Sequence, residues 1–222
     1  MSGALRFSEH LRAAAGPAWD RAARHAFVDR LGDGTLDRAA YRRYLVDDYA
    51  FIDSLAAVIG RAVAAAPGMR PKARLAGFLA ALTSGENDFF LRSFAALDVA
   101  ETDWRGATMG PVMQAFADHM AEAVGQAGYP GALAALLPAE WIYLDWATWL
   151  ADARPRPGDF YFAEWIDLHA SADFVAFVAW LQRETDRVGA AADDATRREM
   201  ERIFLRMVEL EGDFFDWSFG AS

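Results

Sequence analysis

Residues 37–65 read DRAAYRRYLVDDYAFIDSLAAVIGRAVAA, and this stretch decides the fold class. Its apolar side chains recur on one helical face, at Tyr41, Leu45, Ile52, Leu55 and Ile59. No stretch of the chain alternates apolar and polar residues for long enough to compete as a β-strand. The pattern therefore predicts a long amphipathic helix.

The same periodicity predicts further helices, separated by Gly and Pro breakers. They span residues 7–28, 72–97, 109–126, 131–151, 159–188 with a break near Ser171, and 195–219. Pro138 is expected to kink the helix in which it lies. Long helices joined by short loops predict an all-α bundle of about seven helices, in a single domain over residues 1–222.

Composition narrows the class of protein. The net charge is −10, with a single Lys, Lys72, among 22 basic residues, so no basic run could neutralise a phosphate backbone and we expect no nucleic-acid partner. The chain has no Cys, which excludes disulfides, thiolate metal ligands and a cysteine nucleophile. The segment Met1–Arg6 lacks a signal-peptide pattern and no run of 18 apolar residues occurs, so we expect a cytoplasmic protein without a membrane partner.

Four of the predicted helices carry one acid inside the apolar stripe. These acids are Asp48, Glu86, Glu140 and Glu211. The stripe positions hold no basic residue, so carboxylates that converge on one cavity would lack an internal cation. Burial and like-charge proximity would then raise their pKa values towards neutrality, as general acid–base chemistry requires.

A structural interpretation competes with this one, because a single acid on such a stripe usually lies near a helix end or pairs with Arg. Four acids on separate helices favour a shared pocket, which would suit a protonatable aminopyrimidine. Neighbouring aromatic residues could stack on such a ring. They are Tyr49, Phe51, Trp141, Tyr143, Phe214, Phe215 and Trp217. Core filling is the expected role of most of them, with Tyr143 as the exception.

A metal site is the weaker alternative. His169 and Asp173 lie one helical turn apart and could join Glu86 and Glu140 as part of a ligand set for iron or manganese. No second His suits the site, and the Glu-x-x-His and His-Glu-x-x-His motifs are absent. We therefore expect no metal and no cofactor, and we expect His169 to orient substrate or to satisfy a buried hydrogen bond.

Several segments resemble the TenA (thiaminase II) family. Residues 27–55 resemble its N-terminal signature, Leu136–Tyr143 resembles its Leu-Pro-Cys-x-Trp-x-Tyr motif, Trp165-Ile166 begins the next block, and Glu211–Trp217 resembles the C-terminal block. The resemblance implies a haem-oxygenase-like bundle without haem. It also implies a homo-oligomer, a tetramer or a dimer.

The resemblance also implies roles for individual residues. Asp48 matches the family's pyrimidine-binding aspartate, Glu211 its catalytic glutamate, and Tyr143 the tyrosine that positions the catalytic group. Three positions depart from the family pattern. Ala139 replaces the cysteine nucleophile, while Phe51 and His169 replace pocket tyrosines.

The chain thus resembles the cysteine-less branch of the family, which implies thiamin salvage by metal-free hydrolysis of an aminopyrimidine or N-formylaminopyrimidine. We expect Glu211 and Glu140 to be catalytic, and we expect the substrate to be bound by Asp48, Phe51, Tyr143, His169 and Glu86. Two alternatives stay open. One is a non-catalytic pyrimidine-binding or regulatory protein, and the other is an oxidase that uses a non-haem metal or resembles pyrroloquinoline-quinone synthase.

Overall fold

The stretch quoted first forms one long helix, α4 (Arg38–Ala65). Its N-cap is Asp37, whose carboxylate accepts hydrogen bonds from the backbone N–H groups of Ala39 and Ala40, both at 3.0 Å. Two of the N–H groups that every helix start leaves without a partner are thereby satisfied. One face of α4 is buried along most of its length, which confirms the amphipathic pattern.

The computed structural model describes residues 5–220, and every regular element among them is helical, as predicted. The other elements are α1 (Phe7–Ala15), α2 (Pro17–Ala23), α3 (Ala26–Gly32), α5 (Met69–Ala81), the π-helical turn η1 (Leu82–Glu86), α6 (Asn87–Ala96), α7 (Glu101–Trp104), α8 (Pro111–Ala153), α9 (Phe160–Ala170), α10 (Ala172–Ala191) and α11 (Asp194–Phe219). Residues 1–4 and 221–222 of the expected domain lie outside the described residues.

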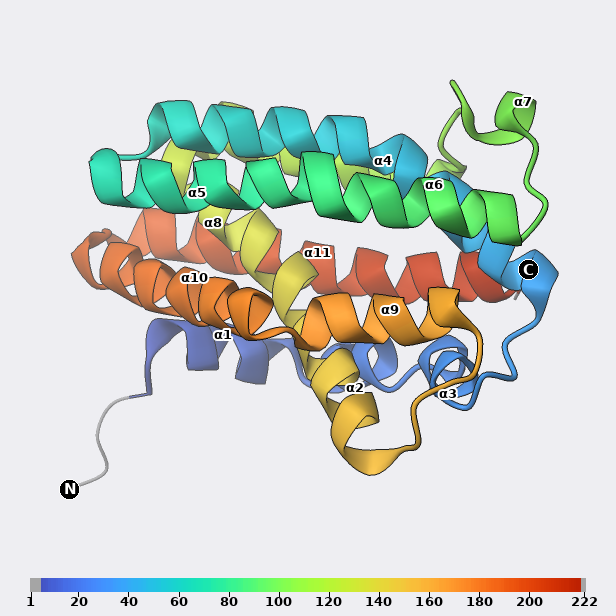
Figure 1. Cartoon of the computed structure of the whole chain (residues 1–222). Coiled ribbons are helices and arrows are strands. Elements are labelled where there is room, and N and C mark those ends of the chain that lie inside the picture. Colours follow the sequence, from blue (N-terminus) through green and yellow to red (C-terminus); the bar gives the residue numbers. More distant parts are fainter. Residues whose placement is uncertain (1–4, 221–222) are drawn as a thin grey trace.

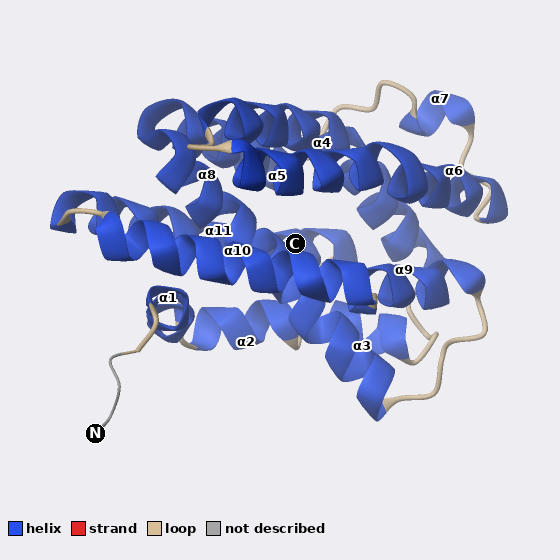
Figure 2. Cartoon of the chain, turned by 60° about the vertical axis from the view of Figure 1, so that its left-hand side comes forward, coloured by secondary structure: helices blue, strands red, loops and turns tan. Residues whose placement is uncertain are grey.

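The helices lie in layers, with α4, α5 and α6 on one side, α9, α10 and α11 in the middle, and α1, α2 and α3 on the other side (Figure 1). Helix α8 packs against α4, α9, α10 and α11, and its second half crosses the bundle. The view turned by 60° keeps the same layers (Figure 2). Because α8 contacts both outer layers, a cavity beside it can receive side chains from several elements.

Several expected helices are divided. The segment 7–28 is interrupted at Gly16, where φ is +51°, and at His25, whose ring caps α3 by accepting from the Phe27 N–H. The break near Ser171 is confirmed, and the Ser171 hydroxyl caps α10 by accepting from the Phe174 N–H. The short helix α7 was not predicted. Glycine conformation and polar capping explain these divisions.

The expected helices 109–126 and 131–151 form the two arms of α8, which bends at Gly128. There φ is 59° and ψ is −135°, a region open essentially only to glycine. Pro138 lies inside the second arm, where the backbone dihedral angles stay helical. Gly128 therefore sets the direction of the second arm, which carries Glu140 and Tyr143.

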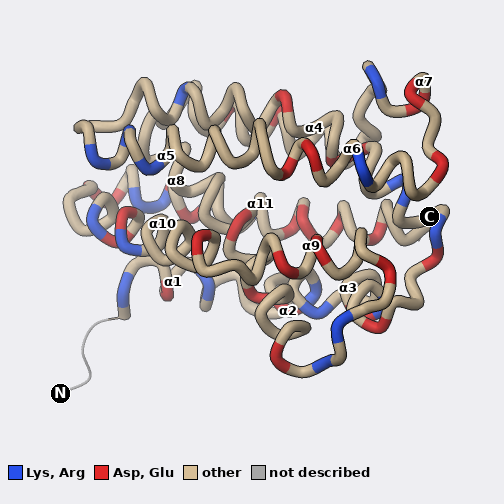
Figure 3. The backbone as a smooth tube through the Cα atoms, in the orientation of Figure 1, with Lys and Arg blue, Asp and Glu red and all other residues tan. Residues whose placement is uncertain are grey.

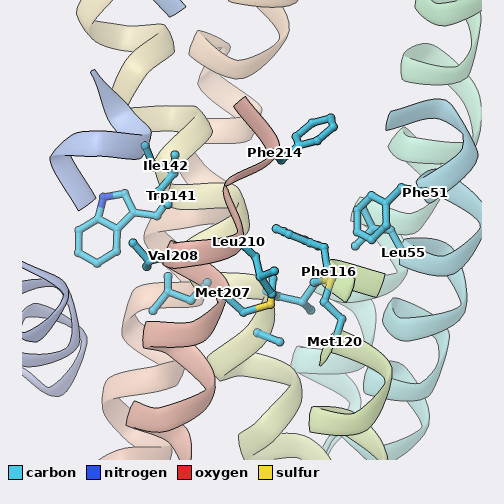
Figure 4. Packing of buried hydrophobic residues seen from close by; sticks show 14 of the residues in the cluster. Phe51, Leu55, Phe116, Met120, Trp141, Ile142, Met207, Val208, Leu210 and Phe214 are labelled. Atoms are coloured by element: carbon cyan, nitrogen blue, oxygen red, sulfur yellow. The ribbon is translucent and has the colours of Figure 1, made fainter. Parts of the chain in front are cut away.

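The core is a continuous set of apolar side chains between the layers. Figure 4 shows Phe51 and Leu55 from α4 beside Phe116 from α8, with Met207 and Leu210 of α11 in the same cluster. Charged residues are spread along the helices of the bundle (Figure 3). Among residues 5–220, no helix is long and apolar enough to cross a membrane.

The bend in α8 gives a first prediction. A Cβ atom added at Gly131 would overlap the carbonyl oxygen of Ala123, which is backbone and cannot swing away. Gly131→Ala should therefore lower the free energy of unfolding, measured in urea, by about 1–3 kcal/mol. Gly125→Ala is the control, because a Cβ there meets no atom within 4 Å and should stabilise the helix by about 0.5–1 kcal/mol. Equal effects of the two substitutions would contradict the bend.

Candidate functional site

The four stripe acids come together at one cavity. Asp48 comes from α4, Glu86 from η1, Glu140 from α8 and Glu211 from α11. The full lining is Asp48, Phe51, Ile52, Leu55, Glu86, Met113, Phe116, Ala139, Glu140, Tyr143, Trp165, His169, Glu211 and Phe214. The structure thus brings together all seven residues predicted for the site. The empty space of the cavity, its open mouth included, is about 480 Å³.

The cavity is acidic and has no counter-cation, since no Lys or Arg is among its lining residues. Glu211 is 2% exposed, Glu140 7% and Asp48 8%. Within residues 5–220, no protein group hydrogen-bonds to the carboxylates of Glu140 or Glu211, so their oxygens are free to bind a ligand that carries hydrogen-bond donors.

Burial and mutual repulsion raise the pKa values of these acids. Burial raises the pKa of Asp48 to about 7, against a hydrogen bond from Tyr44 that lowers it, with a further rise from Asp47. Burial, reinforced by the charge of Asp48, raises the pKa of Glu140 to about 8. Burial, reinforced by Asp48 and Glu140, holds the pKa values of Glu86 and Glu211 well above their usual range. At neutral pH the cavity therefore holds protons that it can donate.

Asp47 and Asp48 are adjacent and equally buried, but their surroundings differ. One Asp47 oxygen accepts from the Gly110 N–H at 2.7 Å, and the other accepts from the Trp217 indole N–H at 2.9 Å. Asp47 thereby ties the start of α8 and the end of α11 to α4. Asp48 faces the cavity instead. The sequence distinguished these neighbours correctly by their helical phase, since only Asp48 falls on the apolar stripe.

A hydrogen-bonded chain holds Tyr143 at the cavity wall. The Trp165 indole N–H donates to the Tyr44 hydroxyl at 3.1 Å, and the Tyr44 and Tyr143 hydroxyls lie 2.8 Å apart. Sequence reasoning gave no role to Tyr44 or Trp165. A signal was present, because Tyr44 precedes Asp48 and Trp165 precedes His169 by four residues, which places each pair on one helical face.

His169 is neutral in this setting. Burial lowers the pKa of His169 to about 4, although its hydrogen bond to the Trp165 carbonyl oxygen opposes the shift. Its Nδ1 lies 2.9 Å from that oxygen, so Nδ1 carries the proton and Nε2 is left as an acceptor. The ring packs 4.4 Å from the Trp165 ring and 4.9 Å from the Tyr143 ring. His169 thus satisfies a buried hydrogen bond, as one of the two expected roles requires.

The other candidates lie elsewhere. Asp173 is not among the residues of the cavity, and within residues 5–220 no group of three or more His, Cys, Asp and Glu is arranged to hold a metal ion. Tyr49 packs against Phe90 and Phe94, and Trp141 packs against Trp19, so these aromatic residues fill the core as expected.

Two further wall residues, Met113 and Phe116, come from the first arm of α8. The apolar stripe of that arm contains no acid, so the pattern of acids within stripes did not predict Met113 and Phe116. They and Phe51 give the cavity an apolar side on which a flat ring could lie. Phe51 and Phe116 themselves pack edge to face, with 5.2 Å between ring centroids.

Comparisons with known proteins agree with this geometry. The sequence model described as the TENA/THI-4/PQQC family matches residues 12–220. A protein named aminopyrimidine aminohydrolase from Halalkalibacterium halodurans is 22% identical, over 97% of this chain and 96% of its own length. A protein of the same name from Bacillus subtilis is 24% identical, over 97% of this chain and 90% of its own length.

Solved structures share the fold. The TenA homologue from P. horikoshii OT3 superposes with a TM-score of 0.87 at 20% identity, covering 98% of this chain and all of that one. A protein titled a TenA family transcription regulator, from Silicibacter sp. TM1040, has a TM-score of 0.87 at 23% identity and covers 96% of both chains. These likenesses confirm the expected fold.

The contrast between Asp47 and Asp48 gives a second prediction. In the folded protein the pKa of Asp48 lies above the ordinary 3.8, so protonated Asp48 stabilises the folded state at low pH. This contribution to the free energy of unfolding is lost as pH rises from about 4 through about 7. Asp48→Asn cannot ionise, so its stability relative to wild type should rise over that window. At about 1.4 kcal/mol per pKa unit, the full change is on the order of 4 kcal/mol.

Asp47→Asn is the matched control, measured by urea unfolding at pH 5 and pH 8. It weakens two part-buried, charge-assisted hydrogen bonds and should destabilise the protein at pH 8 by about 1–3 kcal/mol. The two neighbouring substitutions should therefore act in opposite directions at pH 8. If Asp48→Asn showed no gain in relative stability between pH 5 and pH 8, the raised pKa would be wrong.

Proposed function

This chain belongs to the TENA/THI-4/PQQC family, and we propose that it hydrolyses a C–N bond of an aminopyrimidine that arises from thiamin breakdown. The observation that carries the proposal is that four carboxylates from four elements share one cavity without a Lys or Arg. A ligand rich in hydrogen-bond donors is the complement of such a cavity. The aminohydrolase names of two full-length relatives support the reaction class.

The substrate is 4-amino-5-aminomethyl-2-methylpyrimidine or its N-formyl derivative. Ionised Asp48 accepts hydrogen bonds from the exocyclic amine and from a protonated ring nitrogen. A bound cation lowers the pKa of Asp48 again, because it compensates the carboxylate charge. Phe51 and Phe116 offer the apolar side against which the ring stacks. The polar side of the ring is bordered by Tyr143, whose hydroxyl contacts that of Tyr44, and by neutral His169.

Glu211 and Glu140 divide the proton transfers. Burial raises the pKa of Glu211 well above its usual range, so Glu211 is the acid that donates a proton to the departing nitrogen. Two mutually repelling buried acids favour a state with one proton between them, which leaves Glu140 ionised to take a proton from water. The water oxygen bonds to carbon as the C–N bond breaks. The products are ammonia and the alcohol, or formate and the free amine.

The chain's own residues suffice for this metal-free route. Ala139 stands on the cavity wall beside Glu140, so water, and not a thiolate, is the nucleophile. We place the reaction in the cytoplasm and in a homo-oligomer, a tetramer or dimer, as the family resemblance implies. Its only other partner is the small pyrimidine, and neither a membrane nor a nucleic acid takes part.

Glu211→Gln tests the proposal. Glutamine keeps the size of the side chain but cannot donate an acidic proton, so the rate of ammonia or formate release should fall about 10²–10⁴-fold. The matched control is Glu209→Gln on the same helix, whose exposed carboxylate pairs with Arg206 at 2.9 Å and should leave the rate unchanged.

Activity that survives Glu211→Gln would refute the assigned role. A wild-type protein that shows a thermal shift with the aminopyrimidine but releases neither product would instead be a non-catalytic binding protein. Oxygen consumption together with stoichiometric bound iron would identify the oxidase alternative.

A further inference from the structure

A second hollow adjoins the acidic cavity and shares two of its walls. We call it the outer groove; it lies between α5–η1 and α9–α10, and Gly77, Phe78, Ala81, Phe174 and Phe177 line it. Glu86 and His169 line both the outer groove and the acidic cavity. Its empty volume, including its opening to solvent, is about 1240 Å³. The two shared residues therefore mark where the hollows meet.

The π-helical turn η1 brings Glu86 to this boundary. A π turn disturbs the backbone hydrogen bonds to carbonyl oxygens of the preceding helix. Here two side-chain hydroxyls donate to such carbonyl oxygens. Thr83 donates to the Leu79 carbonyl oxygen at 2.8 Å, and Ser84 donates to the Ala80 carbonyl oxygen at 2.6 Å. Glu86 is partly exposed, whereas Asp48, Glu140 and Glu211 are buried, so one side of Glu86 faces outwards.

The outer groove is lined by small residues and three Phe side chains, and Arg74 of α5 and Asp173 of α10 also line it. Phe78 and Phe177 stack with ring centroids 4.1 Å apart, and Phe174 meets the His169 ring edge to face at 5.0 Å. Gly77 leaves room, because a Cβ there meets no atom within 4 Å. The side of the groove formed by these three Phe residues suits an apolar, flat group.

We infer that the outer groove holds the acyl group of the substrate, which makes amides of the aminomethylpyrimidine with acyl groups larger than formyl substrates of this site. The inference rests on the proposed function. The pyrimidine lies among the acids, and the acyl group leaves the cavity between Glu86 and His169. Water adds to the acyl carbon and the C–N bond breaks. The departing nitrogen takes a proton, giving the free aminomethylpyrimidine and a carboxylic acid.

The test compares N-formyl and N-benzoyl aminomethylpyrimidine. Wild type should hydrolyse the benzoyl amide with a kcat/KM at least as high as that of the formyl amide. Ala81→Phe fills the groove about 7 Å along the helix from Glu86, at about 1.5 Å per residue. It should lower the benzoyl-to-formyl ratio of kcat/KM at least tenfold. Ala76→Phe, exposed on the same helix but outside the groove, is the control and should leave the ratio unchanged.

The outcomes separate the two proposals. Turnover of the formyl amide with exclusion of the benzoyl amide overturns the acyl subsite and leaves the proposed function intact. An equal loss on both amides with Ala81→Phe also overturns it, because the substitution then acts on the fold or on the whole site. If neither amide nor the free aminopyrimidine is turned over, the proposed function fails and this inference fails with it.

Discussion

The convergence of four carboxylates, three of them buried, on one cavity without a cation is the constraint on which the rest of the structure depends. An isolated buried charge is costly, and the usual remedies are an ion pair or a retained proton. This protein pairs many of its surface acids with arginine, as at Arg21 and Arg154, and yet keeps arginine out of the cavity. The acids therefore retain protons at neutral pH. Their raised proton affinity lowers the stability of the folded protein when they ionise, and it also allows them to donate protons.

The surrounding scaffold offsets that cost with hydrogen bonds placed just outside the cavity. Asp47 uses both of its oxygens to bind α8 and α11 to α4, so the helix that presents Asp48 is fixed by the residue before it. The Trp165–Tyr44–Tyr143 chain fixes the part of the wall formed by Trp165 and Tyr143. Two local departures from α-helix, at Gly128 and at η1, aim the second arm of α8 and Glu86 at the same space. Functional sites are where such departures are most often tolerated.

Much of this could be predicted from the sequence, because helical periodicity is a local property. The bounds of α4 and the phase that separates Asp47 from Asp48 both follow from one pattern. The interruption of α8 at Gly128 is local too, because a Gly and Pro breaker at residues 128–130 separates the helices expected at 109–126 and 131–151. Other features depend on contacts between distant segments. Met113 and Phe116 reach the cavity because the first arm of α8 packs against α4, so acid spacing could not indicate them.

The central claim is that carboxyl groups in the cavity remain protonated at neutral pH, and infrared spectroscopy tests it most directly. The account predicts that wild type at pH 7 shows the stretching band of a protonated carboxyl group in a dry environment, and that Glu211→Gln loses part of that band. Addition of an aminopyrimidine should shift intensity from the protonated to the ionised band as Asp48 becomes charged. A wild-type spectrum at pH 7 with only ionised carboxylates would contradict the account, because the cavity would then hold no proton to donate.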